Sequence, residues 1–328
     1  MNNLVVFISS FFLGLFFMNF FRKLSLKFNI LKSDKGIPFV GGLGAVIPFI
    51  ICYFLFKHLM VGTIVPIQFL WIIIFSLVLF IIEFIDDLKD FSLKTRVIIQ
   101  IVFVSLVLSK IKGIDIYFLP QWINYILSFL WIMGITNAFN HLDIGDGQCG
   151  GISLIISLAF LIVSILIGNI LMSILFLCIC GVMSAFLLFN LPPARIFMGN
   201  SGSHFFGFLF AVLSMYGDYA SLEKPIVLIL PLLVLGFPLI DTLFLIIIRI
   251  KKGVMPLKKS DDHILLSLVS SGRSIKESLC RIYIVTLLWC LSGVFLLFNT
   301  NIFFILFLLL ALIFTFRLIH KVLPSQSL

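Results

Sequence analysis

One polar stretch decides how this chain folds: Asn137-Ala138-Phe139-Asn140-His141-Leu142-Asp143-Ile144-Gly145-Asp146-Gly147. The sequence on either side is apolar, and residues 127–135 and 152–177 carry no charge. Between 137 and 151 lie three amides, one histidine, two carboxylates and four glycines. Polar groups are costly near lipid and usually face a bundle interior or an aqueous cavity, and glycines break a helix. We therefore predict a membrane helix that ends in a polar, acidic site at the water interface.

The composition predicts an all-α polytopic membrane protein. Of 328 residues, 62% are hydrophobic and 11% are charged, whereas a soluble domain carries about 25% charged residues. A span needs about 20 mostly apolar residues, and most of the chain consists of such segments. We expect one multi-span domain, residues 1–328, with 249–278 as the last large cytoplasmic loop. The net charge of +9 is attributed to basic cytoplasmic loops rather than to nucleic-acid binding.

Apolar segments predict about eleven transmembrane helices, near 4–20, 38–56, 64–85, 97–109, 123–140, 152–168, 170–189, 203–217, 225–248, 279–297 and 301–318. With the N-terminus outside and the C-terminus cytoplasmic, 19 of the 23 Lys and Arg residues lie on the cytoplasmic side. Cytoplasmic loops of membrane proteins carry an excess of Lys and Arg, so this orientation is the predicted one. No basic residue precedes the first apolar segment, so no cleavable signal peptide is expected. The six cysteines lack paired spacing, which predicts free thiols and no zinc.

The polar groups gather on the predicted cytoplasmic face. Acids, amides and glycines follow the third, fifth, seventh and ninth spans. A transporter would be expected to place its polar groups near the membrane midplane, where only Asp241 is expected. This distribution favours an enzyme that joins a water-soluble substrate to a lipid.

Two groups of residues carry the predicted chemistry. Asp86, Asp87 and Asp90 could hold Mg²⁺ or Mn²⁺, or act as a base; the alternative is a solvated loop that only sets topology. The second group, at successive three-residue steps, is Asn137, Asn140, Asp143 and Asp146. Its alternative is a structural hydrogen-bond cluster between helices.

A third candidate region runs from Asn190 to Ser203. Pro192-Pro193 ends a helix, and Gly199-Asn200-Ser201-Gly202-Ser203 is typical of a helix N-terminus that favours phosphate. An ordinary capped turn is the alternative. His263, in the last loop, could equally be a solvated side chain.

Together these segments resemble the polyprenyl-phosphate N-acetylhexosamine-1-phosphate transferases, the MraY/WecA-like glycosyltransferase family 4. The resemblance covers about residues 31–268 and depends on five motifs in order. The motifs are Lys35-Gly36-Ile37-Pro38 with Gly41-Gly42, Asp86-Asp87, residues 137–147, Phe189-Asn190 with residues 193–199, and the loop that contains His263.

The resemblance implies a bacterial inner-membrane glycosyl-phosphotransferase. It would transfer a sugar-1-phosphate from a UDP-sugar to undecaprenyl phosphate, release UMP, and use Mg²⁺, with Mn²⁺ as an alternative. A homodimer is compatible with the family. The implied roles are Asp86 and Asp87 at the lipid phosphate, Asp143 and Asp146 at substrate or metal, Asn140 and Asn200 at the metal, Asn190 and Phe197 at the uridine, Lys35 and His263 at phosphate groups, and Asn137 and Arg195 as further substrate-binding residues.

The chain departs from the family pattern at several positions. Ile144 replaces a glycine of the acidic motif, and Asn200 takes the place of an aspartate. The last loop keeps only His263 of a histidine cluster, and Ser260 replaces an acid. These departures support a second hypothesis, a catalytically silent member that binds lipid phosphate or regulates a partner. A transporter of anionic lipid or sugar is the third.

Overall fold

The computed structural model describes residues 3–33, 36–62, 66–217, 225–253, 262–298 and 301–322. Within these ranges the chain is helical, apart from turns and one isolated bridge between Lys32 and Pro38. The helices are α1 (Asn3–Phe28), α2 (Gly41–Val61), α3 (Ile67–Lys89), α4 (Leu93–Leu108), α5 (Gln121–Leu142), α6 (Gln148–Leu166), α7 (Ile170–Asn190), α8 (Gly199–Tyr216), η1 (Pro225–Ile229), α9 (Leu230–Val234), α10 (Gly236–Lys251), α11 (Ile264–Ser270), α12 (Ile275–Phe295) and α13 (Asn301–Val322).

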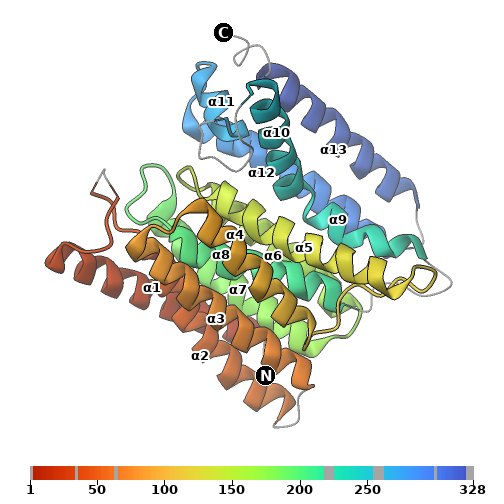
Figure 1. The fold of residues 1–328 in the computed structure, drawn as a ribbon, viewed down its shortest axis with the longest axis horizontal. Coiled ribbons are helices and arrows are strands. Elements are labelled where there is room, and N and C mark those ends of the chain that lie inside the picture. The colour runs from red at the N-terminus through yellow and green to blue at the C-terminus, as the bar shows by residue number, and fades with distance from the viewer. Residues whose placement is uncertain are drawn as a thin grey trace.

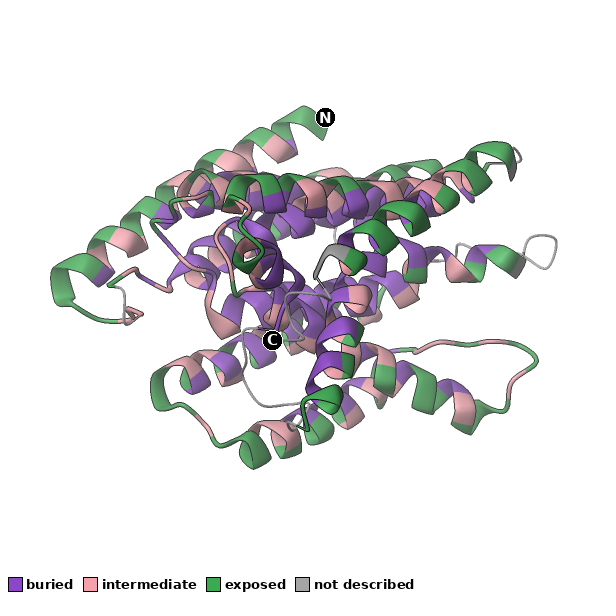
Figure 2. Ribbon diagram, turned by 90° about the horizontal axis from the view of Figure 1, so that it is seen from above, coloured by how far each residue is buried: buried purple, intermediate pink, exposed green. Residues whose placement is uncertain are grey.

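The helices form one bundle around α7 and α8 (Figure 1). The α7 helix packs against α1, α2 and α6, and α8 packs against α2, α3 and α5. Every residue of α8 from Ser201 to Ser214 is buried, whereas the ribbon of α1, which begins at the N-terminus, is mostly exposed or half-buried (Figure 2). The exposed residues of α1 and α13 are largely apolar. Exposed apolar residues on outer helices are expected where lipid rather than water is the solvent.

Eight described helices are long and apolar enough to cross a membrane, or nine if the bent pair of Ile226–Val234 and Gly236–Lys251 forms one span. The pair bends by 67°. The α4 helix, with 16 residues, is too short to be counted as a membrane span. The α8 helix is long enough, but its polar first turns lower its mean hydropathy too far for it to be counted. The structure therefore confirms a helical, apolar protein but not the count of eleven.

Several helix boundaries follow directly from the sequence. The α6–α7 turn contains Gly168, at φ +72°, and Asn169, whose side chain caps α7 by accepting a hydrogen bond from the Met172 N–H. The α7 helix ends at Asn190, before the two prolines. The predicted loop 249–278 contains the short helix α11, and α12 begins at Ile275 rather than near 279.

Candidate active site at the N-terminus of α8

Acids from two other helices meet the N-terminus of α8. Asp87, near the end of α3, accepts hydrogen bonds from the N–H groups of Asn200 at 3.1 Å and Ser201 at 3.0 Å. Asp143, just after α5, accepts one from the Gly199 N–H at 2.9 Å. The first N–H groups of a helix lack partners within the helix and carry partial positive charge. Here two carboxylates supply those partners, which brings α3, α5 and α8 to one point.

Gly199 allows this close approach. Its φ is +81°, and a Cβ there would lie 3.2 Å from Asp87 Oδ2 and from the Phe39 carbonyl oxygen. A side chain would be strained in that backbone region and would press against the carboxylate. The prediction that residues 199–203 begin a helix is confirmed, since α8 starts at Gly199. The positive φ and the nearby carboxylate explain why a glycine occupies this position.

Amide side chains form the inner wall of this site. Asn140 Nδ2 lies 3.2 Å from Asn200 Oδ1. Asn137 donates to Gln100 Oε1 at 3.0 Å and to the Met133 carbonyl at 2.8 Å. Asn137 therefore links α4 to α5, which agrees with the alternative interpretation of a structural hydrogen-bond cluster between helices. Asn140, in contrast, contacts the N-terminus of α8 itself.

The two neighbouring aspartates of α3 have different partners. Asp86 is buried, accepts a hydrogen bond from the Phe91 N–H at 2.7 Å and pairs with Arg96 at 3.1 Å. Arg96 also pairs with the exposed Asp90. The Asp86 carboxylate thus holds the α3–α4 turn, and Asp87 is the acid of this pair that reaches α8.

Asp146 and Asn190 join two turns next to the site. Asp146 accepts a hydrogen bond from the Ala194 N–H at 2.9 Å. Asn190 is 1% exposed, and it accepts from the Gly147 N–H and donates to the Ile196 carbonyl, both at 2.9 Å. Because these bonds hold the 143–147 turn against the 191–198 segment, both side chains have a structural role in joining the two segments.

The other predicted substrate-binding residues surround this cluster. Arg195 is exposed, donates to the Leu188 carbonyl and lies 5.2 Å from the Phe189 ring centroid. Phe197 is half-buried, and its N–H bonds to the Pro38 carbonyl. Lys35 lies outside the described residues.

His263 is buried against two residues that received no role from the sequence. Its Nδ1 lies 3.3 Å from Asp241 Oδ2, and Asp241 also accepts the Ile264 N–H at 3.2 Å. The ring of His141, from α5, lies 6.0 Å from that of His263 between centroids. Asp241 is therefore not an isolated midplane acid: it anchors the last loop beside the end of α5. An acid within an apolar span was the available signal.

Sequence reasoning also missed His204. This α8 residue is 3% exposed, and it contacts Asn140, Gln100 and the Asn200 carbonyl. Glu83 of α3 lies 3.5 Å from its Nδ1. Both side chains are ionisable groups in otherwise apolar segments, which was the signal that could have identified them.

Burial raises the pKa of Asp143 to about 7, and the nearby Asp87 carboxylate adds to this shift, while the hydrogen bond from Gly199 opposes it. Two carboxylates so close together raise the free energy of a doubly charged site unless a cation compensates.

The donor set suits a hard cation only in part. Within the described residues no group of three or more His, Cys, Asp or Glu side chains could hold a metal. Mg²⁺, however, is commonly held by one or two carboxylates together with substrate phosphates and water. Asp87 and Asp143, with amide oxygens from Asn140 and Asn200, fit that mode, because all four are hard oxygen donors beside a phosphate-favouring helix end.

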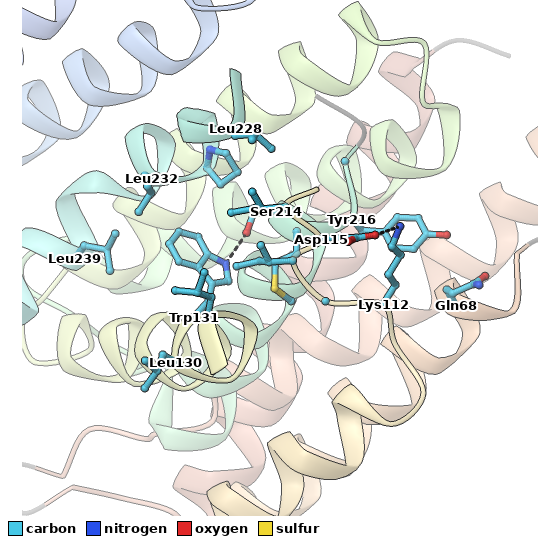
Figure 3. A pocket seen from close by; sticks show the side chains of 17 residues that line it. Gln68, Lys112, Asp115, Leu130, Trp131, Ser214, Tyr216, Leu228, Leu232 and Leu239 are labelled. Atoms are coloured by element: carbon cyan, nitrogen blue, oxygen red, sulfur yellow. Dashed lines mark hydrogen bonds and ion pairs between the residues drawn. The ribbon is translucent and has the colours of Figure 1, made fainter. Parts of the chain in front are cut away.

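A cavity of ≈ 770 Å³ lies at the other end of α8 (Figure 3). Its walls are mostly apolar and include Leu130, Leu232 and Leu239, and the Trp131 N–H bonds to Ser214 Oγ at 3.1 Å. Lys112 and Asp115 form an exposed ion pair at 2.9 Å in its lining. None of the predicted site residues lines this cavity.

Comparison with known proteins gives a consistent result. Residues 69–218 match glycosyl transferase family 4. The chain is 30% identical to the probable undecaprenyl-phosphate N-acetylglucosaminyl 1-phosphate transferase of Bacillus subtilis, over 88% of this chain and 81% of that protein. It is 26% identical to the undecaprenyl-phosphate alpha-N-acetylglucosaminyl 1-phosphate transferase of Escherichia coli K12, over 88% and 82% of the two chains. Identity to the Thermotoga maritima protein of that same name is 31%, over 58% of each.

Proposed function

The chain belongs to glycosyl transferase family 4, and from this membership we propose that it transfers a sugar-1-phosphate from a UDP-sugar to undecaprenyl phosphate. UMP is released, and the product starts a lipid-linked surface glycan. The names of the relatives support N-acetylglucosamine-1-phosphate, an N-acetylhexosamine-1-phosphate, as the transferred group. The observation that carries the proposal is the meeting of Asp87 and Asp143 at the N-terminus of α8.

The reaction joins two phosphates. An oxygen of the lipid phosphate forms a bond to the phosphorus that bears the sugar, and the bond from that phosphorus to the UMP oxygen breaks. Like charges approach in this step, so positioning and charge stabilisation dominate catalysis. A bound Mg²⁺ would neutralise charge on the reacting phosphates.

The residues of this chain divide that work. Asp87 and Asp143, with Asn140 and Asn200, would hold the cation at the helix end. The N-terminal N–H groups of α8 favour the phosphates. Arg195 and His263 would contact the donor diphosphate, and Phe197 would pack on the uracil. Asp86 would act indirectly, since Arg96 and the Phe91 N–H occupy its carboxylate.

We propose that α4 and α8 also cross the bilayer. Together with the bent pair and the eight longer helices, they give eleven spans in a bacterial inner membrane. An outside N-terminus then puts the ends of α3 and α5 and the start of α8 in the cytoplasm, where UDP-sugars are made. Cysteine labelling from each side of intact cells tests this topology, and cross-linking in membranes tests a homodimer.

The decisive experiment measures UMP release by the purified protein in detergent. Undecaprenyl phosphate and a panel of UDP-sugars are supplied, with Mg²⁺, with Mn²⁺ or with EDTA. We expect release from one donor that requires both the lipid and the divalent cation. If no donor yields UMP while a B. subtilis relative is active alongside, the alternative of a catalytically silent member, which Asn200 favours, replaces this proposal.

A further inference from the structure

Two side chains from α11 and α12 contact residues 143–147, the acidic turn. Leu265 of α11 lies against Gly145, because a Cβ on that glycine would clash with Leu265 Cδ2. Tyr283 of α12 donates a hydrogen bond from its hydroxyl to the Gly147 carbonyl at 2.6 Å. The proposed reaction gives neither side chain a task, although the turn that they contact carries two of its acids.

Two glycines make room for the Tyr283 ring. A Cβ at Gly151 would clash with the hydroxyl and the ring of Tyr283, and a Cβ at Gly147 would lie 3.2 Å from the hydroxyl oxygen. Positions four apart share one face at the start of a helix, so both glycines open the same face of α6 to α12. The hydroxyl can therefore reach a backbone carbonyl that larger side chains would cover.

The Gly147 peptide groups are held from two directions. The Gly147 N–H donates to Asn190 Oδ1 at 2.9 Å. The Gly147 carbonyl accepts from the Gly151 N–H at 3.0 Å as well as from Tyr283. Since the carbonyl would keep the Gly151 N–H without the tyrosine hydroxyl, the hydroxyl is not required to satisfy a buried acceptor. Its distinct contribution is to join α12 to the acidic turn.

The carboxylates of the turn have partners in a different part of the chain. Asp143 accepts from the Gly199 N–H and Asp146 accepts from the Ala194 N–H, both at 2.9 Å. These bonds hold the side chains of the acids, whereas Leu265 and Tyr283 contact the backbone that carries them. Movement of that backbone would change where both carboxylates lie, because a short aspartate side chain cannot compensate for it.

We propose that Tyr283 and Leu265 are positioning residues, which hold the acidic turn so that Asp143 stays at the N-terminus of α8 and Asp146 stays at the Ala194 N–H. The inference depends on the proposed function, because it assigns this support to the acids of that reaction. If the two side chains only packed α11 and α12 on α6, the tyrosine hydroxyl would not matter.

The position of Gly145 agrees with this role. The chain has Ile144 where the family pattern has a glycine, and the glycine that follows it provides the space in which Leu265 lies. The departure from the pattern at this turn is therefore matched by a contact from α11.

Amide hydrogen exchange tests the support of the turn without any turnover. Mass spectrometry of the purified protein in detergent follows peptides that cover residues 143–151 in wild type, Tyr283→Phe and Thr286→Val. Phenylalanine keeps the ring and removes only the hydroxyl. Thr286→Val is the matched control, since it removes a buried hydroxyl of α12 that bonds to the Ile282 carbonyl of its own helix at 2.8 Å. We expect about threefold faster exchange at residues 143–151 in Tyr283→Phe and wild-type exchange there in Thr286→Val.

The Mg²⁺ dependence of UMP release tests the effect on the reaction. A protein that is only destabilised loses turnover at every Mg²⁺ concentration, whereas displaced acids require more Mg²⁺ for the half-maximal rate. We expect that concentration to rise about tenfold in Tyr283→Phe and in Leu265→Ala. Leu268→Ala is the control for the second variant, because it truncates another buried leucine of α11. It should keep the wild-type Mg²⁺ requirement.

The outcomes separate this inference from the proposed function. Wild-type exchange of the turn in Tyr283→Phe, equally faster exchange throughout that protein, or the same change in Thr286→Val would overturn the support of the turn. An unchanged Mg²⁺ requirement in Tyr283→Phe and Leu265→Ala, or an equal rise in Leu268→Ala, would overturn the positioning role. Absent UMP release in wild type together with the expected exchange pattern would reject the transferase activity and leave the support of the acidic turn in place.

Discussion

The two ends of α8 differ in almost every respect. At Gly199–His204, carboxyl and amide groups from α3, α4 and α5 converge on one helix N-terminus. At Ser214–Gly217, mostly apolar residues line the cavity of ≈ 770 Å³, and the hydrogen bonds of Trp131 to the Ala211 carbonyl and Ser214 Oγ, both 3.1 Å, link α5 to α8.

The cavity and the cluster of carboxylate and amide groups thus lie at opposite ends of the same helix. The empty space lies where the walls can offer a ligand mostly apolar contact. The groups suited to phosphate and cation chemistry are closely packed and largely hydrogen-bonded to one another. This cavity alone would therefore not have indicated the end of α8 where the predicted site residues meet.

The sharpest test of the comparison is Asp87→Asn. This change removes a carboxylate that faces the Asn200 and Ser201 N–H groups. We expect UMP release to fall about 10²–10³-fold, with membrane insertion unchanged. Asp90→Asn is the matched control, because Asp90 is exposed and pairs only with Arg96 among the contacts described. Equal losses in both variants would contradict a special position for Asp87.

Close packing at the N-terminal end predicts sensitivity to Gly202→Ala. A Cβ at Gly202 would lie 2.6 Å from the Gly42 Cα of α2, so backbone must move. Such overpacking costs about 1–3 kcal/mol and should lower the thermal unfolding temperature in detergent. Gly134→Ala in α5 is the control, since its Cβ would meet nothing within 4 Å. A stable Gly202→Ala protein would show that α2 and α8 can separate freely.

Asn200→Asp should have a smaller effect. Aspartate keeps the oxygen that accepts from Asn140 Nδ2 and adds negative charge next to the proposed cation. We expect UMP release at the wild-type level or higher, by at most about tenfold. Collapse of activity in a normally folded protein would mean that the site is built around the Asn200 amide.

The smallest effect is expected at the cavity end. Ser214→Ala removes one acceptor of the Trp131 N–H, which keeps the Ala211 carbonyl at 3.1 Å. Such bonds in membrane proteins contribute about 0.6 kcal/mol, so thermal stability should change slightly and UMP release should not. A large loss of UMP release would show that the cavity end of α8 also contributes to activity, and would contradict the functional difference between the two ends.

Much of the fold could be predicted because apolar length and helix-breaking residues act locally. The end of α7 at Asn190 before two prolines, the Gly168-Asn169 turn and the α8 start at Gly199 all follow from local rules. The site's position at one set of helix ends followed from where acids and amides interrupt apolar sequence. The roles of the individual predicted site residues stay predictions.

Partner choice could not be predicted. Asp86 and Asp87 are adjacent and chemically identical, yet one faces Arg96 and the other faces α8. That assignment depends on how α3 rotates against α8, which no local pattern fixes. The same holds for His204 and Glu83, 121 positions apart in sequence, and for Asp241, whose partner His263 lies in a separate segment.

Because α8 follows α3 and α5 in the sequence, the site at its N-terminus can form only late in the synthesis of the chain. Asp87 and Asp143 leave the ribosome well before Gly199, so the emerging chain carries two carboxylates without the helix end that receives them. Only when α8 inserts between α3 and α5 do these acids acquire their N–H donors. A nascent chain stopped before α8 would therefore insert its earlier helices but could not assemble the helix end that is proposed to bind phosphate, and we expect truncated products to be inert rather than partially active.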